Sequence, residues 1–192
     1  SYIVAGQLLP PTGSDDEILM EYMNYAIGGS FTSRLNMNLR EDKSWSYGVR
    51  NWLADAKGQR SILVNAPVQT DKTADSIKEI IKEFEYYLGD QPIRYDELEK
   101  AKSSKTLRLP GRFETLGSLL GGMTNIVQYD RSLNYLDELS SLYSEPTLEE
   151  VQNTARKYLK PNQWSWLIVG DLKEIESEVR ALNLGEVKII SN

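Results

Sequence analysis

Arg40 and Tyr47 are the residues of this chain best suited to chemistry, and they stand seven positions apart within the segment LREDKSWSYG of residues 39–48. A guanidinium stays charged at ordinary pH, and a phenol adds a further hydrogen-bond donor. Aimed at one point, the two groups could hold a carbonyl group or stabilise a developing oxyanion. A purely structural interpretation stays open. Arg40 could form a surface ion pair with Glu41 or Asp42. Tyr47 could be partly buried in a sheet.

The composition excludes several classes of catalytic site. His and Cys are both absent from the 192 residues, so the chain has no imidazole base, no thiolate and no disulfide. A metal site within the chain would need oxygen ligands alone, which suit calcium or magnesium better than zinc. Asp15, Asp16 and Glu17 could bind such a cation, although favourable charge at a helix start explains them better. The net charge of −6 argues against binding to nucleic acid.

Arg40 and Tyr47 are predicted to lie on either side of a turn between a helix and a strand. Helical spacing of apolar residues predicts a helix from Ser33 to about Asp42, and alternation predicts a strand from Ser46 to Ala54. A short turn between them would bring the guanidinium and the phenol side by side. A second alternating run, Arg60 to Pro67, follows a hairpin-like turn and predicts an antiparallel pair.

The remaining segments predict an α+β fold, in which a mainly antiparallel sheet has helices packed on one face. Ser14, Asp15 and Asp16 offer oxygens that could cap a first helix, and the glycines at 117, 121 and 122 predict that another part of the protein packs close to that backbone. Further strands are expected at Tyr2–Leu8, Trp164–Val169 and Glu186–Ile190. Helices are expected at residues 14–28, from 71 onward, from 95 to a break at Pro110 and Gly111, and at 113–129, 136–143, 147–158 and 172–182.

The sequence contains no apparent membrane or targeting segment. Its apolar stretches fall far short of the roughly 20 residues that span a bilayer, and the N-terminus lacks the pattern of a signal peptide. Residues 1–192 have no linker-like stretch, so we expect a single domain. Because the chain opens directly on a predicted strand, we expect it to be a piece of a longer protein. The sequence does not indicate a compartment.

The segment GGSFTSRLNMNLRE of residues 28–41, followed by Tyr47 and Gly48, resembles the insulinase/pitrilysin family of zinc metallopeptidases. Specifically, it resembles the histidine-free type of domain of that family. Where this chain has Ser44 and Trp45, the family commonly has Gly and an aliphatic residue. The resemblance covers nearly the whole chain, because further family-like segments follow in the expected order: QTDKT (69–73), ELEKAK (97–102), PGRFET (110–115), TLEEVQ (147–152) and VGD (169–171).

The resemblance implies an insulinase/pitrilysin-like metallohydrolase domain with a defined role for Arg40 and Tyr47. Family members build a hollow clamshell from two homologous halves, one of which carries an H-x-x-E-H helix that binds zinc and supplies the general base. The facing half carries an Arg and a Tyr that hold the peptide backbone and stabilise the oxyanion. Arg40 and Tyr47 match those two positions.

The resemblance also implies which components lie outside this chain. The chain would be the non-catalytic C-terminal domain of a longer peptidase, with no metal of its own and no activity in isolation. Zinc and the H-x-x-E-H motif would belong to a homologous partner domain or subunit, and the substrate would be a peptide. An alternative stays open, in which the chain is a structural or peptide-binding subunit of the same fold with no hydrolytic role.

Overall fold

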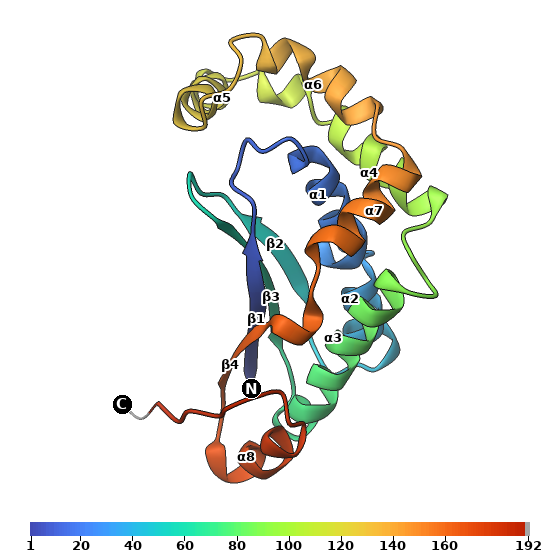
Figure 1. The fold of residues 1–192 in the computed structure, drawn as a ribbon, viewed down its shortest axis with the longest axis vertical. Helices are drawn as coiled ribbons and strands as arrows, with labels where there is room; N and C mark the ends of the chain where they lie inside the picture. The colour runs from blue at the N-terminus through green and yellow to red at the C-terminus, as the bar shows by residue number, and fades with distance from the viewer. Residues whose placement is uncertain (191–192) are drawn as a thin grey trace.

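The computed structural model describes residues 1–190, which form a four-stranded sheet with helices on one face (Figure 1). All neighbouring strands are antiparallel. The predicted α+β class is therefore confirmed. The strands, in the spatial order β2-β3-β1-β4, are β1 (Tyr2–Leu9), β2 (Arg50–Ala54), β3 (Arg60–Pro67) and β4 (Ser165–Val169).

The helices pack along one side of the sheet and continue as an arch beyond the β2–β3 hairpin, where α5 and α6 curve over its end (Figure 1). No helix within residues 1–190 is long and apolar enough to cross a membrane. The α-helices are α1 (Glu17–Asn24), α2 (Arg34–Asn36), α3 (Thr73–Leu88), α4 (Tyr95–Thr106), α5 (Leu116–Gln128), α6 (Tyr135–Ser144), α7 (Leu148–Tyr158) and α8 (Leu172–Ala181). Two π-helical segments, η1 (Tyr25–Gly29) and η2 (Met37–Asp42), continue α1 and α2, and short 3₁₀ turns are η3 (Thr70–Lys72), η4 (Pro110–Arg112) and η5 (Pro161–Gln163).

The alternation of side chains gives the sheet one buried face and one open face. Ile3 of β1 and Ile62 and Val64 of β3 are fully buried beneath the helices. The side chains of opposite parity have no helix over them (Figure 1). We call this second side the open sheet face, and its large exposed apolar residues are Tyr2, Leu8, Trp52, Leu167 and Val169.

The strand expected at Glu186–Ile190 is wrong, because this segment pairs with no strand. The edge strands β2 and β4 each keep one free side, but the segment pairs with neither of them. Val187, Ile189 and Ile190 are instead 39%, 49% and 82% exposed. An alternating pattern indicates that a segment could pair, but the pairing needs a free edge with a matching buried face.

The glycines of α5 are expected to have close neighbours, and two of the three do not. A Cβ added at Gly121 would meet nothing within 4 Å, and one at Gly117 would meet only the nearby Thr115 side chain at 4.0 Å. Only Gly122 is approached closely, by the Leu136 side chain at 3.2 Å. The expectation of close packing is therefore wrong for Gly117 and Gly121, and α5 is largely exposed.

Asp16 occupies the position before α1 but makes no side-chain cap, so the predicted capping role is wrong for this residue. Its carboxylate accepts hydrogen bonds at 2.7 Å from Lys157 Nζ and from the Tyr158 hydroxyl. These bonds keep the pKa of Asp16 below its usual value of 3.8. The carboxylate thus ties the start of α1 to the end of α7, which lies about 140 residues later in the sequence.

We expect Asp16→Asn to reduce the acid sensitivity of folding. Because the folded-state pKa is the lower one, the contact stabilises the fold above about pH 4, and its contribution is lost as the pH falls through the folded pKa. The substitution should cost about 1 kcal/mol or less at pH 7, since Lys157 is mostly exposed. Urea unfolding at pH 7 and pH 3 measures the effect, and the gap from wild type should narrow at pH 3. The control is Asp15→Asn, and an unchanged gap would contradict the assignment.

Candidate functional site

Arg40 lies in η2, on a helix that is anchored in the core through Leu35 and Leu39, both fully buried. Its guanidinium carbon lies 4.5 Å from the centroid of the Phe31 ring. Its Nη1 atom lies 2.9 Å from the Glu41 carboxylate, so the ion pair left open by the sequence is present. That contact lacks the alignment of a hydrogen bond, and the buried Nη1 has no hydrogen-bond partner among the described residues. Arg40 is thus held by the Phe31 ring and the Glu41 carboxylate.

Tyr47 is fully exposed, at 100% of its possible surface. The strand expected from Ser46 begins only at Arg50, and Ser46 makes just an isolated bridge with Val68. The Ser46 hydroxyl donates to the Pro67 carbonyl at 2.5 Å and accepts from the Gly48 N–H at 3.1 Å. Such side-chain bonds to the backbone compete with ladder bonds. Tyr47 therefore lies on a bend before the sheet, and the interpretation that it is partly buried is wrong.

The turn between Arg40 and Tyr47 is held by several backbone bonds. The Trp45 N–H donates to the Leu39 carbonyl at 2.9 Å, so the chain doubles back directly after the helix. Ser44 has a φ of 56°, the left-handed conformation that favours glycine. This is the position where the resembled family commonly has Gly. The Gln69 side chain donates to the Ser44 carbonyl at 3.0 Å, which supports the turn without a glycine.

Asn36 connects the surroundings of Arg40 with those of Tyr47. Its buried Oδ1 accepts from the Val49 N–H at 3.0 Å, two residues beyond Tyr47. Its Nδ2 donates at 2.6 Å to the carbonyl of Phe31, the residue whose ring contacts Arg40. Sequence reasoning missed Asn36. The available signal was a polar residue next to Leu35 on the apolar side of a helix.

We expect Asn36→Leu to loosen the segment that follows Tyr47. The change leaves the Val49 N–H and the Phe31 carbonyl unpaired, which should cost about 1–3 kcal/mol of stability. Amide hydrogen exchange should accelerate at Val49 more than in the central strands. As a control, Asn38→Leu alters the same helix but removes bonds only to Glu79 and Glu83 on α3. Unchanged protection of Val49 in Asn36→Leu would show that Asn36 does not hold this segment.

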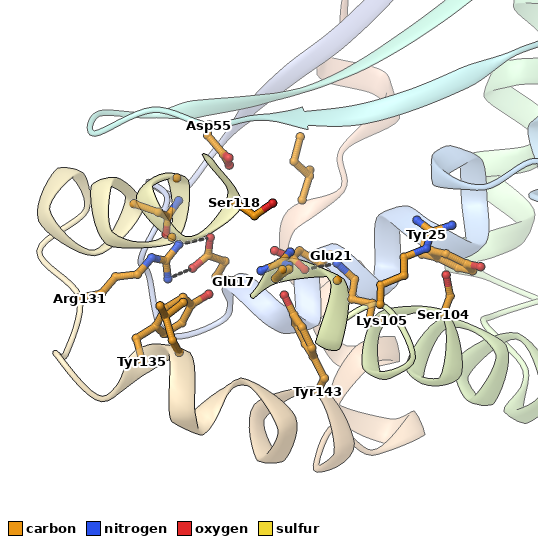
Figure 2. Close-up of a pocket in the computed structure, with 18 of the residues that line it drawn as sticks. Glu17, Glu21, Tyr25, Asp55, Ser104, Lys105, Ser118, Arg131, Tyr135 and Tyr143 are labelled. Carbon is orange, nitrogen blue, oxygen red and sulfur yellow. Dashed lines mark hydrogen bonds and ion pairs between the residues drawn. The ribbon is translucent and has the colours of Figure 1, made fainter. Parts of the chain in front are cut away.

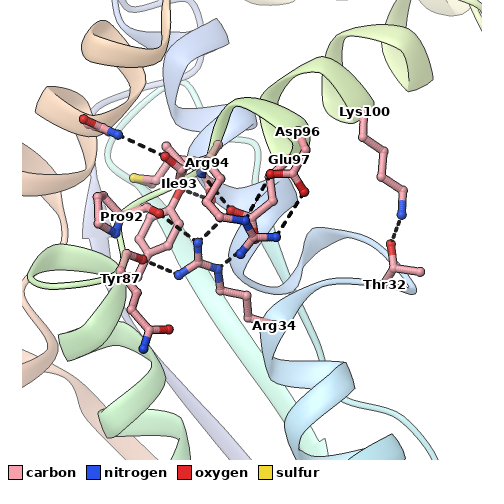
Figure 3. Close-up of polar contacts among 12 residues, drawn as sticks. Thr32, Arg34, Tyr87, Pro92, Ile93, Arg94, Asp96, Glu97 and Lys100 are labelled. Carbon is pink, nitrogen blue, oxygen red and sulfur yellow. Dashed lines mark hydrogen bonds and ion pairs between the residues drawn. The ribbon is translucent and has the colours of Figure 1, made fainter.

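Arg34, at the start of the same helix, anchors it to the α3–α4 connection (Figure 3). Its Nε and Nη2 donate to the two carboxylate oxygens of Glu97 at 2.8 and 2.6 Å. Nη2 also donates to the Pro92 carbonyl at 2.9 Å, Nη1 donates to the Gln91 carbonyl, and the guanidinium lies 5.0 Å from the Tyr87 ring. The ion pair is largely buried, with Arg34 10% and Glu97 14% exposed. The first turn of the helix that carries Arg40 is therefore fixed by tertiary contacts.

The acidic residues near the start of α1 bind cationic side chains of the chain itself. Asp16 binds Lys157, and the Glu17 carboxylate forms a bidentate pair with Arg131. Asp15 is exposed. Within residues 1–190, no group of three or more His, Cys, Asp or Glu side chains could hold a metal ion.

Comparison with known proteins identifies one family. Residues 1–105, more than half of the chain, match the family model described as the peptidase M16 inactive domain. No curated protein matches the chain. Similar solved structures include the peptidase M16 inactive domain from Pseudomonas fluorescens, which is 20% identical with a TM-score of 0.78, over 86% of this chain and 39% of that chain.

Two other solved structures have the same fold. A protease from Helicobacter pylori is 17% identical with a TM-score of 0.77, over 86% of this chain and 40% of its own. The inactive peptidase domain of a candidate zinc protease from Bordetella parapertussis is 15% identical with a TM-score of 0.75, over 86% of this chain and 90% of its own. The chain thus spans about two fifths of the first two structures and nearly all of the third.

Proposed function

The chain belongs to the peptidase M16 family, that of insulinase and pitrilysin, as a domain of the inactive type, and we propose that it holds peptide substrate for a zinc-binding partner domain. The partner supplies the metal and the general base through an H-x-x-E-H helix. This chain has no histidine and contributes Arg40 and Tyr47 instead. The two side chains bind the peptide backbone and stabilise the oxyanion during hydrolysis.

The observation that carries this proposal is the full exposure of Tyr47 on a bend that is itself well held. A tyrosine without packing contacts does nothing for the stability of its own domain, so its placement is better explained by a partner outside the domain. The Arg40 guanidinium, at the other side of the same turn and with 34% of its side chain exposed, supports the assignment. Both groups are hydrogen-bond donors that a peptide carbonyl could accept from.

The open sheet face is the proposed wall of the substrate chamber. Trp52 is 42% exposed and Leu167 53% exposed on this face, although both lie in strands. A sheet face that exposes several large apolar side chains and has no helix over it is a candidate interaction surface (Figure 1). An extended peptide could cover it, with its backbone directed to Arg40 and Tyr47.

Reconstitution tests the proposal. We expect the isolated chain to contain no stoichiometric zinc and to cut no peptide, because the metal and the base belong to the partner. Mixing it with a domain that carries H-x-x-E-H should restore turnover of a fluorogenic peptide. Elemental analysis and peptide turnover are the measurements. Zinc bound one to one by this chain and removable by chelators would contradict the proposal, and an assembly that binds peptides without cutting them would support the structural or peptide-binding alternative.

A further inference from the structure

A cavity of about 770 Å³ lies between the β2–β3 hairpin, α1 and the arch of α4, α5 and α6 (Figure 2). Its volume falls within the range of roughly 300–1,000 Å³ typical of small-molecule sites. Neither Arg40 nor Tyr47 lines it. The cavity is thus separate from the proposed peptide site, and the inference drawn from it does not rest on the proposed function.

Two ion pairs lie in the cavity wall, and within each pair the two charges cancel. Arg131 donates to both carboxylate oxygens of Glu17 at 2.6 and 2.8 Å, and both side chains are more than nine-tenths buried. Lys105 forms an ion pair with Glu21 (Figure 2). These four groups therefore add no net charge to the cavity.

Arg60 is the least satisfied charge in the cavity. Its side chain is 1% exposed, and its Nη1 lies 3.7 Å from the nearest oxygens of Glu17 and Asp55, too far for a hydrogen bond. Its Nη2 contacts only the Met20 sulfur at 3.7 Å. The buried Nε of Arg60 has no partner among the described residues. A buried guanidinium without a close acceptor is costly, so the cavity is a better host for an anion than for a neutral molecule.

The charge balance of the whole cavity also favours an anionic ligand. Arg108 and Arg112 also line it, and neither forms an ion pair with another residue of the described chain. Five cationic side chains and three carboxylates line the cavity altogether, a surplus of two positive charges. A phosphate monoester carries about −1.5 to −2 charges at pH 7, which would match this surplus.

We propose that this cavity binds a small dianionic molecule through its oxyanion groups, with Arg108 and Arg112 as the cationic contacts and the buried Arg60 adding positive charge behind the wall. The chemistry common to the possible ligands is that of a phosphate monoester or a dicarboxylate. Planar guanidinium groups bind both kinds of oxyanion in bidentate fashion. The wall also contains Leu53, Leu119 and Phe113, so it can accept an apolar body attached to the anionic group.

Tyr135 can assist as a neutral donor. Burial raises the pKa of Tyr135 to about 12, and the nearby Arg131 only partly offsets this rise. The phenol therefore keeps its proton at neutral pH and can donate to an oxyanion.

Calorimetric titration of the 192-residue chain tests the proposal with phenyl phosphate, inorganic phosphate and succinate as probes, and phenol as the neutral control. We expect saturable one-to-one binding of a dianion with a dissociation constant below about 1 mM. Tighter binding of phenyl phosphate would identify a phosphate ligand, and tighter binding of succinate would identify a dicarboxylate. Either result supports an oxyanion site, whereas no saturable binding of any anion overturns it.

Substitutions locate the binding. Arg108→Gln combined with Arg112→Gln should weaken it by about tenfold or more, because charged hydrogen bonds are lost at the cavity. The matched control, Arg156→Gln with Lys173→Gln, removes the same charge from exposed positions elsewhere. Equal weakening in the control would mean an adventitious ion only, drawn by overall charge, and would overturn the proposal.

Arg60→Gln tests the buried charge, since it removes the positive charge behind the cavity wall and keeps a polar side chain. We expect about a tenfold weakening of anion binding in a chain with an unchanged circular dichroism spectrum. Unchanged affinity would exclude Arg60 from the site and overturn its assignment. If this buried variant does not fold, the double substitution at Arg108 and Arg112 alone decides whether the cavity binds the anion.

Discussion

Tyr47→Phe should lower peptide turnover by the assembled peptidase by about 10²–10³-fold, the usual effect of removing one oxyanion donor. The same change should leave the stability of this chain within about 0.5 kcal/mol of wild type, because the hydroxyl lies on a fully exposed side chain with no packing contacts. Steady-state kinetics on the assembly and urea unfolding of the isolated chain are the two measurements. Their combination separates loss of chemistry from loss of fold.

The kinetic parameters show which step the pair serves. If Tyr47 and Arg40 act only on the oxyanion, kcat and kcat/KM fall together, whereas loss of backbone binding raises KM. Arg40→Ala should give a fall of similar size. Arg40→Lys should recover part of the activity, because it keeps the charge but not the fork of donors.

Tyr95→Phe is the matched control for Tyr47→Phe. Tyr95 is 67% exposed at the start of α4 and lies outside the Arg40 turn, so its hydroxyl should be dispensable for turnover. Wild-type turnover in Tyr47→Phe, with peptide binding retained, would remove the oxyanion role. It would favour a structural or peptide-binding role for the domain.

The helix that carries Arg40 could be predicted from the sequence because its pattern is local. Leu35 and Leu39 stand four residues apart and are both fully buried, as helical spacing predicts. The π-helical form of η2 could not be predicted, since it is set by bonds such as that from the Lys43 N–H to the Asn38 carbonyl. Such a register depends on what the helix packs against and not on residue type.

The exact surroundings of Tyr47 escaped prediction because they depend on contacts between distant segments. Ser46 leaves the strand pattern through its bond to Pro67, 21 residues away. Asn36 accepts from Val49, 13 residues away, and a single polar residue in a helix does not indicate such a partner. The charges of the cavity are more distant still, because Glu17 and Arg131 are 114 residues apart. Local patterns carry no information about these pairings.

Arg34→Met should destabilise the chain by about 3–5 kcal/mol, the usual cost of breaking a buried ion pair by removing one partner. The change leaves the buried Glu97 carboxylate with Arg94 alone, whose Nη1 lies 3.5 Å away and whose backbone N–H donates to it at 2.9 Å, and it unpairs the carbonyls of Gln91 and Pro92 (Figure 3). Arg94→Met is the control, since Arg94 pairs with Asp96 and more distantly with the same Glu97 carboxylate but is 61% exposed. That surface pair should contribute about 1 kcal/mol or less. Urea unfolding of both variants measures the difference.

Arg34→Met combined with Glu97→Leu separates the cost of the abandoned charge from the value of the pair. Replacement of both partners by apolar groups removes the buried carboxylate, so the double variant should be more stable than Arg34→Met alone. Recovery should be incomplete, because the Gln91 and Pro92 carbonyls still lack their donor. Glu97→Leu also removes the acceptor of the Arg94 N–H at the start of α4. A double variant no more stable than Arg34→Met would therefore place the cost in these unpaired backbone groups and not in the charge.

The single variant Arg34→Met also tests whether Arg34 positions Arg40. The α-helical part of this helix spans only Arg34–Asn36, and a helix so short depends on tertiary contacts for its stability. Loss of the Arg34 anchor should therefore speed hydrogen exchange in η2 before the sheet opens, and peptide turnover should fall by more than the unfolded fraction explains. If exchange in η2 and in the sheet rises equally, Arg34 contributes to global stability alone. Arg40 would then owe its position to the buried leucines and to Phe31.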